Sequence, residues 1–338
     1  MKFKKKISLL LMPLITFGFL VGCGKKEVSE DEIVKVRLNE VVRSVFYSPL
    51  YVAINEGFFL EEGIEIELST GQGADKTMQQ VLSKSADIGF SGPEQVIYIT
   101  NQGREDNPVV FAQLTLTDGA FLVGREEDPD FKWSDLKGAE VIGGRPGGMP
   151  QMAFEYALKK NALEKDKDVS LVTNIDFTAT SGAFIAGTAD YVTLFEPTAS
   201  MLEKEGKGKI VASIGEEAGN LPYTCFYATK SYMEENPEVI QKFTNAIYKG
   251  QTWVSTHTNE EIAKSIIEFF PGTDEDILAS VMGNYKKINA IATTPYILEE
   301  DLIRLMDVID SYDSDLLTDR PSFEKIVDNS FAEKAVKK

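Results

Sequence analysis

Residues 189–198 read ADYVTLFEPT and residues 86–95 read ADIGFSGPEQ, so one short plan occurs twice in the chain. In both stretches Ala-Asp opens a run of β-branched and aromatic residues, which is typical of a buried parallel strand. A proline follows where a helix would begin, at a position whose backbone N–H has no intrahelical partner. Each stretch therefore predicts a strand that ends in a tight turn and leads into a helix.

Ligands of open α/β sheets bind in the crevice beyond the carboxyl ends of the strands. Because two such strand ends occur in two halves of one chain, we expect two lobes with a ligand held between them. The chain has 338 residues, of which 43% are hydrophobic, and this is enough for two domains with their own cores.

The first residues differ in composition from the rest of the chain. Lysines at position 2 and positions 4–6 precede an apolar stretch over residues 7–20, and residues 20–23 read LVGC. This pattern is typical of a secretory signal peptide and is too short for a stable membrane span. An uncleaved anchor is the alternative interpretation.

The ending of this segment resembles a bacterial lipobox, which implies that Cys23 is lipidated and becomes the mature N-terminus. Residues 1–22 are then a lipoprotein signal peptide, and residues 23–32 are a charged tether. We expect the body of the protein on the extracytoplasmic face of the cell membrane, held there by its lipid.

The mature chain is strongly acidic. Removal of residues 1–22 takes away four lysines and no acidic residue, which lowers the formal net charge from −18 to about −22. So acidic a surface argues against nucleic acid and anionic lipid as partners.

Residue types that serve catalysis or metal binding are scarce. Cys225 is the single cysteine left after lipidation, and His257 is the single histidine. A Ser-His-Asp triad, a histidine-rich zinc site and a Cys-His pair all lack parts, so the sequence predicts no enzyme, no metal site and no cofactor. We expect Cys225 in a buried strand and His257 at a helix end.

The order of the predicted elements divides the mature chain into lobes. The predicted strand over residues 109–116 ends in Thr117-Asp118-Gly119, and a fresh strand follows over residues 120–123 without a helix between them. This arrangement indicates a crossing between lobes, and the predicted strand over residues 223–229 indicates the return.

We therefore assign residues 33–118 to the first part of lobe I, residues 119–227 to lobe II, and residues 228–338 to the mostly helical completion of lobe I. In the last segment, Thr258 to Glu261 has the pattern of a capping box that opens a helix.

Three charged residues occupy predicted turns at the crevice, and each has an ordinary alternative role. Asp118 faces the crevice or forms a simple turn with Gly119. Arg145, within a glycine-rich turn, pairs with a ligand carboxylate or sulfonate or is a surface cation. Glu196 accepts from ligand N–H groups or stabilises the first turn of the following helix through the helix dipole.

Together these features resemble the nitrate/taurine-type family of ABC-transporter substrate-binding proteins, which includes sulfonate-binding and thiamine-pyrimidine-precursor-binding (NMT1/THI5-like) proteins. The resemblance rests on the lipobox at Cys23, YSPLYVA at 47–53 with EGFF at 56–59, ADIG at 86–89 and WSDLKG at 133–138. It implies a periplasmic-binding-protein type II fold, two α/β lobes joined by two crossover strands. A monomer of this fold closes on a small molecule and delivers it to a membrane permease powered by an ATPase.

The resemblance also implies which loops and turns face the ligand, and Tyr223 at the start of the predicted return strand adds a further ring. The predicted ligand-binding residues are Arg43, Phe46, Tyr47, Gly73, Ser91, Gly92, Thr117, Asp118, Arg145, Phe195, Glu196 and Tyr223. The aromatic members of this set can stack on a flat ring, and the two acids can accept from its amino groups or neutralise a cation.

We therefore expect an aromatic heterocycle such as thiamine or a pyrimidine precursor. Family members that bind such precursors usually carry a tryptophan and a histidine before Pro49, where this chain has Val41 and Tyr47. Because Arg43 and Arg145 are possible donors, an alkanesulfonate, taurine or another oxyanion is the alternative ligand. A sensory lipoprotein and a pyrimidine-synthesis enzyme are the remaining alternatives, and the enzyme would need a cysteine-rich motif that the chain lacks.

Overall fold

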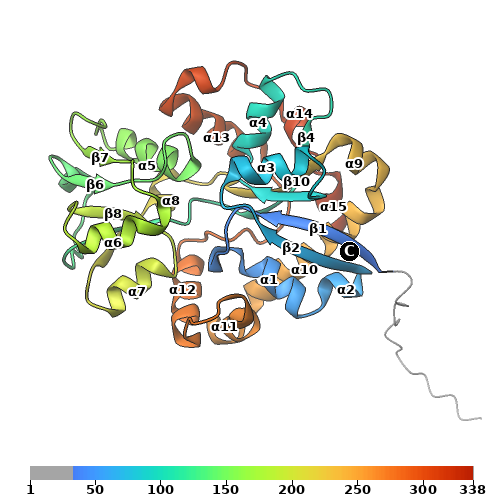
Figure 1. Cartoon of the computed structure of the whole chain (residues 1–338), viewed down its shortest axis with the longest axis horizontal. Helices are drawn as coiled ribbons and strands as arrows, with labels where there is room; N and C mark the ends of the chain where they lie inside the picture. The colour runs from blue at the N-terminus through green and yellow to red at the C-terminus, as the bar shows by residue number, and fades with distance from the viewer. Residues whose placement is uncertain (1–32, 338) are drawn as a thin grey trace, which may run out of the picture.

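Two five-stranded sheets organise residues 33–337, the part of the chain that the computed structural model describes (Figure 1). The strand order is β2-β1-β3-β10-β4 in the first sheet and β7-β6-β8-β5-β9 in the second. The predicted signal peptide, Cys23 and the tether lie outside the described residues. Over residues 33–337, none of the helices has the length and apolar character needed to cross a bilayer.

The first sheet joins strands from the beginning of the chain to one strand from its second half. Its members are β1 (Val34–Glu40), β2 (Ile64–Thr70), β3 (Ile88–Ser91), β4 (Pro108–Thr115) and β10 (Thr224–Thr229). β1 is parallel to β2 and β3, whereas β10 is antiparallel to β3 and β4. This sheet and the helices on it form lobe I. Because β10 begins at Thr224, residues 224–227, which the sequence analysis assigned to lobe II, lie in the sheet of lobe I.

The second sheet forms lobe II. Its members are β5 (Phe121–Gly124), β6 (Glu140–Ile142), β7 (Ser170–Val172), β8 (Tyr191–Leu194) and β9 (Lys209–Ser213). β6 is parallel to β7 and β8, whereas β5 is antiparallel to β8 and β9. Each sheet thus contains one strand that runs antiparallel to both of its neighbours, β10 in the first sheet and β5 in the second. Each of these strands begins just after a crossing between the sheets.

The two Ala-Asp stretches form equivalent strands, β3 and β8. Asp87 Oδ2 accepts from the backbone N–H of Arg37 on β1, and Asp190 Oδ2 accepts from that of Glu140 on β6, both at 2.9 Å. Each aspartate therefore fixes the register of its strand against a parallel neighbour. The predicted parallel pairing occurs on one side of each strand, with β1 and β6, and on the other side β10 and β5 lie antiparallel.

Helices cover both faces of the two sheets (Figure 1). In lobe I before the first crossing they are α1 (Ser48–Asn55), α2 (Phe58–Glu61), α3 (Ala74–Leu82) and α4 (Glu94–Asn101). In lobe II they are α5 (Met149–Lys160), α6 (Thr180–Ile185), α7 (Thr198–Lys204) and α8 (Ile214–Ala218). Pro93 and Pro197 are the N-cap residues of α4 and α7, so each helix begins one residue after its proline and not at the proline as predicted.

The remainder of the chain is helical. It contains α9 (Lys230–Glu235), α10 (Pro237–Thr256), α11 (Asn259–Ile266), α12 (Glu275–Lys287), α13 (Glu299–Tyr312), α14 (Phe323–Ile326) and α15 (Ser330–Val336). Short 3₁₀ turns are η2 (Val45–Tyr47), η3 (Trp133–Leu136), η4 (Phe177–Ala179), η5 (Ile267–Phe269) and η6 (Ser314–Leu316). The capping box at Thr258 and Glu261 is confirmed, since each side chain accepts from the other residue's N–H.

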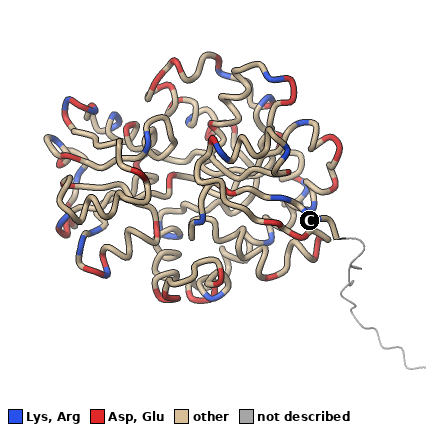
Figure 2. The backbone as a smooth tube through the Cα atoms, in the orientation of Figure 1, with Lys and Arg blue, Asp and Glu red and all other residues tan. Residues whose placement is uncertain are grey.

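α12 and α13 place this helical segment against lobe II. α12 packs on α7 and α13 packs on α5, and in Figure 1 the two helices lie below and above the crossings. The largest apolar cluster is centred in lobe I, where Phe226 stacks on Phe90 at 4.2 Å, and it extends to Phe121 and Leu194 of lobe II. Charged residues occur throughout both lobes (Figure 2).

Gly89 explains why the ADIG motif ends in glycine. A Cβ there would overlap the Tyr227 ring on β10 and would lie 2.8 Å from a methyl of Val81, and Tyr227 is paired with Gly89 in the ladder. We expect Gly89→Ala to lower the free energy of unfolding by about 1–3 kcal/mol, because overpacking forces β3 away from β10.

Urea unfolding measures this effect. Gly182→Ala in α6 is the matched control, because no heavy atom lies within 4 Å of its added Cβ, and it should be neutral or stabilising. Equal losses in both variants would contradict the packing argument.

Candidate functional site

The two crossings between the lobes lie side by side and carry the candidate site. The Leu221 N–H donates to the Leu116 carbonyl at 2.9 Å, and the Tyr223 N–H donates to the Thr115 carbonyl at 3.3 Å. The Thr117 hydroxyl donates to the Gly215 carbonyl at 2.8 Å. Thr117 is therefore engaged within the crossing itself.

Aromatic residues from both lobes meet beside these crossings. Phe46 of η2 stacks on Tyr285 of α12 at 4.7 Å and lies 5.8 Å from Tyr47 and 6.0 Å from Tyr223. From lobe II, Phe195 lies 6.5 Å from Tyr223. We call these five residues the aromatic cluster.

The cluster depends on a glycine in the crossing. A Cβ at Gly119 would lie 2.6 Å from the Phe46 ring. The chain therefore needs glycine there to bring the crossing against Phe46.

Asp118 is fully buried in the first crossing. Its Oδ1 accepts from the Ala120 N–H at 2.6 Å, as a turn aspartate does. Its Oδ2 and the Tyr223 hydroxyl have no partner of good hydrogen-bond geometry among residues 33–337, but the two groups lie close enough for Tyr223 to donate to the Asp118 carboxylate and oppose the effect of burial on its pKa. Burial raises the pKa of Asp118 to about 7. Asp118 thus has its predicted turn role and also a free acceptor atom.

Glu94, which the sequence analysis missed, is a second buried acid near the aromatic cluster. Its side chain is 2% exposed, its Oε1 accepts from the Gln95 amide at 3.3 Å, and within the described chain its Oε2 has no hydrogen-bond partner. Burial raises the pKa of Glu94 to about 7. A signal was present, because Glu94 directly follows Pro93 in one Ala-Asp copy and Glu196 directly precedes Pro197 in the other.

Glu196 connects lobe II to α12. Its carboxylate accepts from the Ser200 N–H at 2.9 Å, from the Ser200 hydroxyl at 2.8 Å and from the Asn284 amide at 2.7 Å. Burial raises the pKa of Glu196 above its usual value, against these hydrogen bonds. The residue lies just before the N-cap of α7, where it accepts from the Ser200 N–H in the first turn, and it is also a contact between the lobes.

The two predicted arginines are engaged elsewhere. Arg43 donates to Glu40 Oε1 at 2.6 Å and lies over the rings of Tyr51 and Phe269. Arg145 is exposed and pairs with Asp75 across the lobes at 3.4 Å. Among residues 33–337, the charged and ring partners of the two guanidinium groups are therefore Glu40, Tyr51, Phe269 and Asp75, all of which lie outside the aromatic cluster.

The remaining predicted positions are structural neighbours of the site. Ser91 shares a 2.8 Å hydrogen bond with the Tyr227 hydroxyl. Gly73 caps α3, and Gly92 leaves space that the Glu94 carboxylate occupies. Ser91, Gly73 and Gly92 therefore shape the turns around the site. The side chains that form the site itself are those of the aromatic cluster, Asp118 and Glu94.

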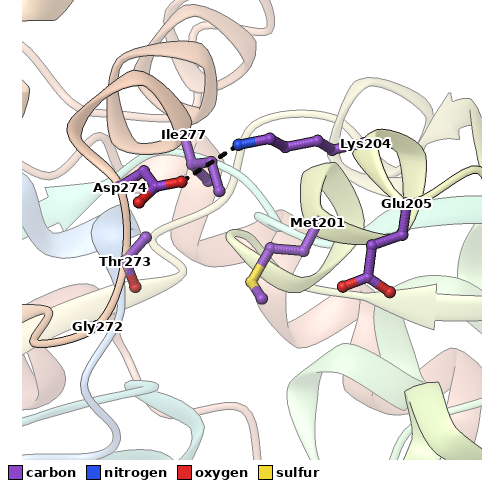
Figure 3. Close-up of a pocket in the computed structure, with 7 residues that line it drawn as sticks. All are labelled: Met201, Lys204, Glu205, Gly272, Thr273, Asp274 and Ile277. Carbon is purple, nitrogen blue, oxygen red and sulfur yellow. Dashed lines mark hydrogen bonds and ion pairs between the residues drawn. The ribbon is translucent and has the colours of Figure 1, made fainter.

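Further contacts join the lobes around the site. The Gly147 N–H donates to the Tyr312 hydroxyl at 3.1 Å, on the side where α13 lies. On the side of α12, Lys204 pairs with Asp274 at 3.3 Å beside a cavity of about 400 Å³ (Figure 3). This cavity is lined by Met201, Lys204, Glu205, Gly272, Thr273, Asp274 and Ile277, none of which is a predicted ligand residue.

The two residue types considered for catalysis have ordinary surroundings. Cys225 is buried in β10, and burial raises the pKa of its thiol. His257 caps α10 and stacks on Trp253 at 3.8 Å. Both placements agree with the sequence analysis. Within residues 33–337, no group of three His, Cys, Asp or Glu residues is arranged to hold a metal ion.

Comparison with known proteins gives a consistent set of relatives. A family model described as NMT1/THI5 like matches residues 46–261. The chain is 44% identical over 305 residues to YtlA of Bacillus subtilis (strain 168), a candidate binding protein by its name, and the match covers 90% of this chain and 91% of YtlA.

Two further matches are more distant. The formylaminopyrimidine-binding protein of Halalkalibacterium halodurans is 27% identical over 274 residues, with 78% of each chain covered. The periplasmic aliphatic sulphonate binding protein SsuA of Escherichia coli superposes with a TM-score of 0.69 at 16% identity, which covers 87% of this chain and 97% of SsuA. The second match confirms the predicted two-lobe periplasmic-binding-protein fold.

The raised pKa of Glu94 makes a prediction for stability. Between its ordinary pKa of 4.5 and its folded value of about 7, the folded state holds a proton that the unfolded state has released. The free energy of unfolding therefore falls as the pH rises through this window, by up to about 3 kcal/mol for this group. We expect Glu94→Gln to remove that part of the fall.

Urea unfolding of both proteins at pH values from 5 to about 8 gives the two profiles. The exposed acid Glu126 provides the control Glu126→Gln, whose profile should match the unmodified protein. Parallel profiles for Glu94→Gln and the unmodified protein would rule out a buried protonated Glu94.

Proposed function

The chain belongs to the NMT1/THI5-like family, and on that premise we propose that it is the solute-binding component of an ABC importer. In this role it closes on a small organic molecule and delivers it to a membrane permease and its ATPase. The two-lobe fold shared with SsuA and the side chains gathered at the crossings support the proposal. Binding occurs without turnover, as the burial of Cys225 and the helix-capping position of His257 suggest.

The crossings serve as the hinge of this movement. Their mutual hydrogen bonds keep the two connecting segments together while the lobes rotate about them. The ion pairs Arg145–Asp75 and Lys204–Asp274 join exposed side chains, so each stabilises the closed form by only about 0–1 kcal/mol. The buried hydrogen bond between Glu196 and Asn284 also joins the lobes, so this contact has to break when they open and release the ligand.

The proposed ligand is an aromatic heterocycle such as thiamine or a pyrimidine precursor. The observation that carries this assignment is the aromatic cluster, to which both lobes contribute rings, beside a buried carboxyl group with a free oxygen. Rings from two sides can enclose a flat ligand, and the carboxyl group can accept from its amino substituents. The formylaminopyrimidine-binding relative supports the same chemistry.

We propose Phe46, Tyr47, Asp118, Phe195 and Tyr223 as the residues that contact the ligand. Glu196 then contributes through the lobe contact with Asn284, with its carboxylate oxygens already accepting hydrogen bonds. Gly73, Ser91, Gly92 and Thr117 shape the surrounding turns.

An alkanesulfonate or another oxyanion is the second candidate ligand. The fold shared with SsuA favours it, but an oxyanion needs donors and positive charge. Arg43 is neutralised by Glu40, and Arg145 is at the exposed edge with Asp75. The acids therefore favour the heterocycle.

Calorimetry on the purified protein tests the ligand class. We expect one saturable site for thiamine or for a methylaminopyrimidine, and Phe46→Ala should weaken binding at least about tenfold because it removes a buried stacking ring. Ile303→Ala, an exposed apolar residue of α13, is the control and should leave the affinity unchanged. Heat from taurine or alkanesulfonates alone would assign the site to oxyanions.

We further propose that the protein is a lipoprotein of the extracytoplasmic membrane face, anchored through Cys23. The LVGC sequence behind a basic and apolar leader supports this location. Cys23→Ser should abolish incorporation of labelled palmitate and move the protein out of the membrane fraction. Cys225→Ser is the control, because Cys225 is buried, and it should retain both label and membrane fraction. Labelled, membrane-bound Cys23→Ser would contradict the anchor.

A further inference from the structure

Glu94 and Asp118 differ from the other buried acids of the described chain. Glu40 accepts from Arg43 and Tyr51, Glu155 pairs with Lys165, Glu196 accepts from Ser200 and Asn284, and Asp301 pairs with Arg304. Over residues 33–337, neither Glu94 nor Asp118 forms an ion pair. Glu94 has one oxygen in a single hydrogen bond and the other without a partner, and Asp118 accepts from the Ala120 N–H while its other oxygen faces the uncharged Tyr223 hydroxyl.

The two acids flank the same aromatic rings. Glu94 is the first residue of α4, four positions after Phe90 of β3, and Phe90 meets the Tyr47 ring edge-on at 4.6 Å. Asp118 lies in the first crossing next to Gly119, which abuts the Phe46 ring, and Phe46 and Tyr47 are 5.8 Å apart. The two acids therefore lie around one site, and besides burial and other neighbours their charges both raise the pKa of Tyr47 and of Tyr223.

The cation that acts on Glu94, Arg145, already pairs with another acid. Arg145 exerts a weak attraction on Glu94, but it is exposed and pairs with Asp75, whose own charge opposes that attraction. A buried carboxylate without a partner costs several kcal/mol, in general. The site therefore lacks a cation that would let both acids ionise.

We propose that Glu94 and Asp118 form a two-carboxyl subsite that binds the positively charged group of an aromatic ligand. A protonated amine or an azolium ring supplies the missing charge, donates to or lies against the free oxygens, and meets the faces of the surrounding rings. This inference rests on the proposed function and specifies its ligand as a cation. Glu94 becomes a residue that determines ligand specificity.

A matched pair of small molecules tests the proposal. One is an aminopyrimidine with an aminomethyl side chain, which is a cation near neutral pH, and the other carries a neutral hydroxymethyl group instead. Calorimetry at pH 8 should show the aminomethyl compound binding at least about tenfold more tightly. Thiamine, whose azolium ring is always charged, serves as a third probe.

Variants then locate the effect. Glu94→Gln and Asp118→Asn should each weaken the aminomethyl compound at least about tenfold while changing the hydroxymethyl compound less than about threefold. The exposed variant Glu126→Gln should change neither. Thermal unfolding shows whether each variant is folded. If a variant is not folded, the comparison of the two pyrimidines on the unmodified protein decides whether the subsite binds a cation.

The outcomes separate the two claims. Equal or tighter binding of the hydroxymethyl compound would mean that the acids act as neutral groups, which overturns the cation subsite and leaves the heterocycle assignment standing. Binding of taurine with no binding of the three probes would overturn both.

Discussion

The pairing of the two crossings is the constraint on which the rest of the structure depends. Leu221 and Tyr223 donate to the segment that ends β4, and Thr117 donates to the Gly215 carbonyl in α8. Because the chain passes twice between the sheets at one place, two lobes share one narrow connection. Side chains that project beside it, such as Phe46 and Asp118, necessarily come between the lobes.

The strand plan that occurs twice gives each lobe an equivalent edge at this connection. Asp87 and Asp190 fix the registers of β3 and β8, so that Glu94, at the start of α4, and Glu196, just before α7, both lie beyond the ends of these strands. The two acids then differ in their surroundings. Glu196 is satisfied by Ser200 and Asn284, whereas Glu94 retains an oxygen without a hydrogen-bond partner in the described chain, which gives the equivalent turns separate roles.

The sequence was sufficient to predict the features that depend on residues close together in the chain. The strands of the Ala-Asp stretches, the capping box at Thr258 and the return of β10 were predictable from period, proline and polar spacing. The contact of Arg43 with the Phe269 ring and the position of Tyr285 were not, because they depend on which distant elements meet. Glu94 was within reach of a stricter comparison of the two repeats, but its isolation from cations is visible only in three dimensions.

The central claim is that the lobes move about the crossings and close on a ligand. Spin labels on the exposed residues Glu65 of β2 and Lys167 of lobe II, introduced as Glu65→Cys and Lys167→Cys, report the distance between the lobes while the native Cys225 stays buried. Pulsed electron paramagnetic resonance would compare protein stripped of bound molecules with protein reloaded with the molecules released by denaturing it after purification from its host. The account predicts a shorter and narrower distance distribution after reloading. An identical distribution in both samples would contradict it.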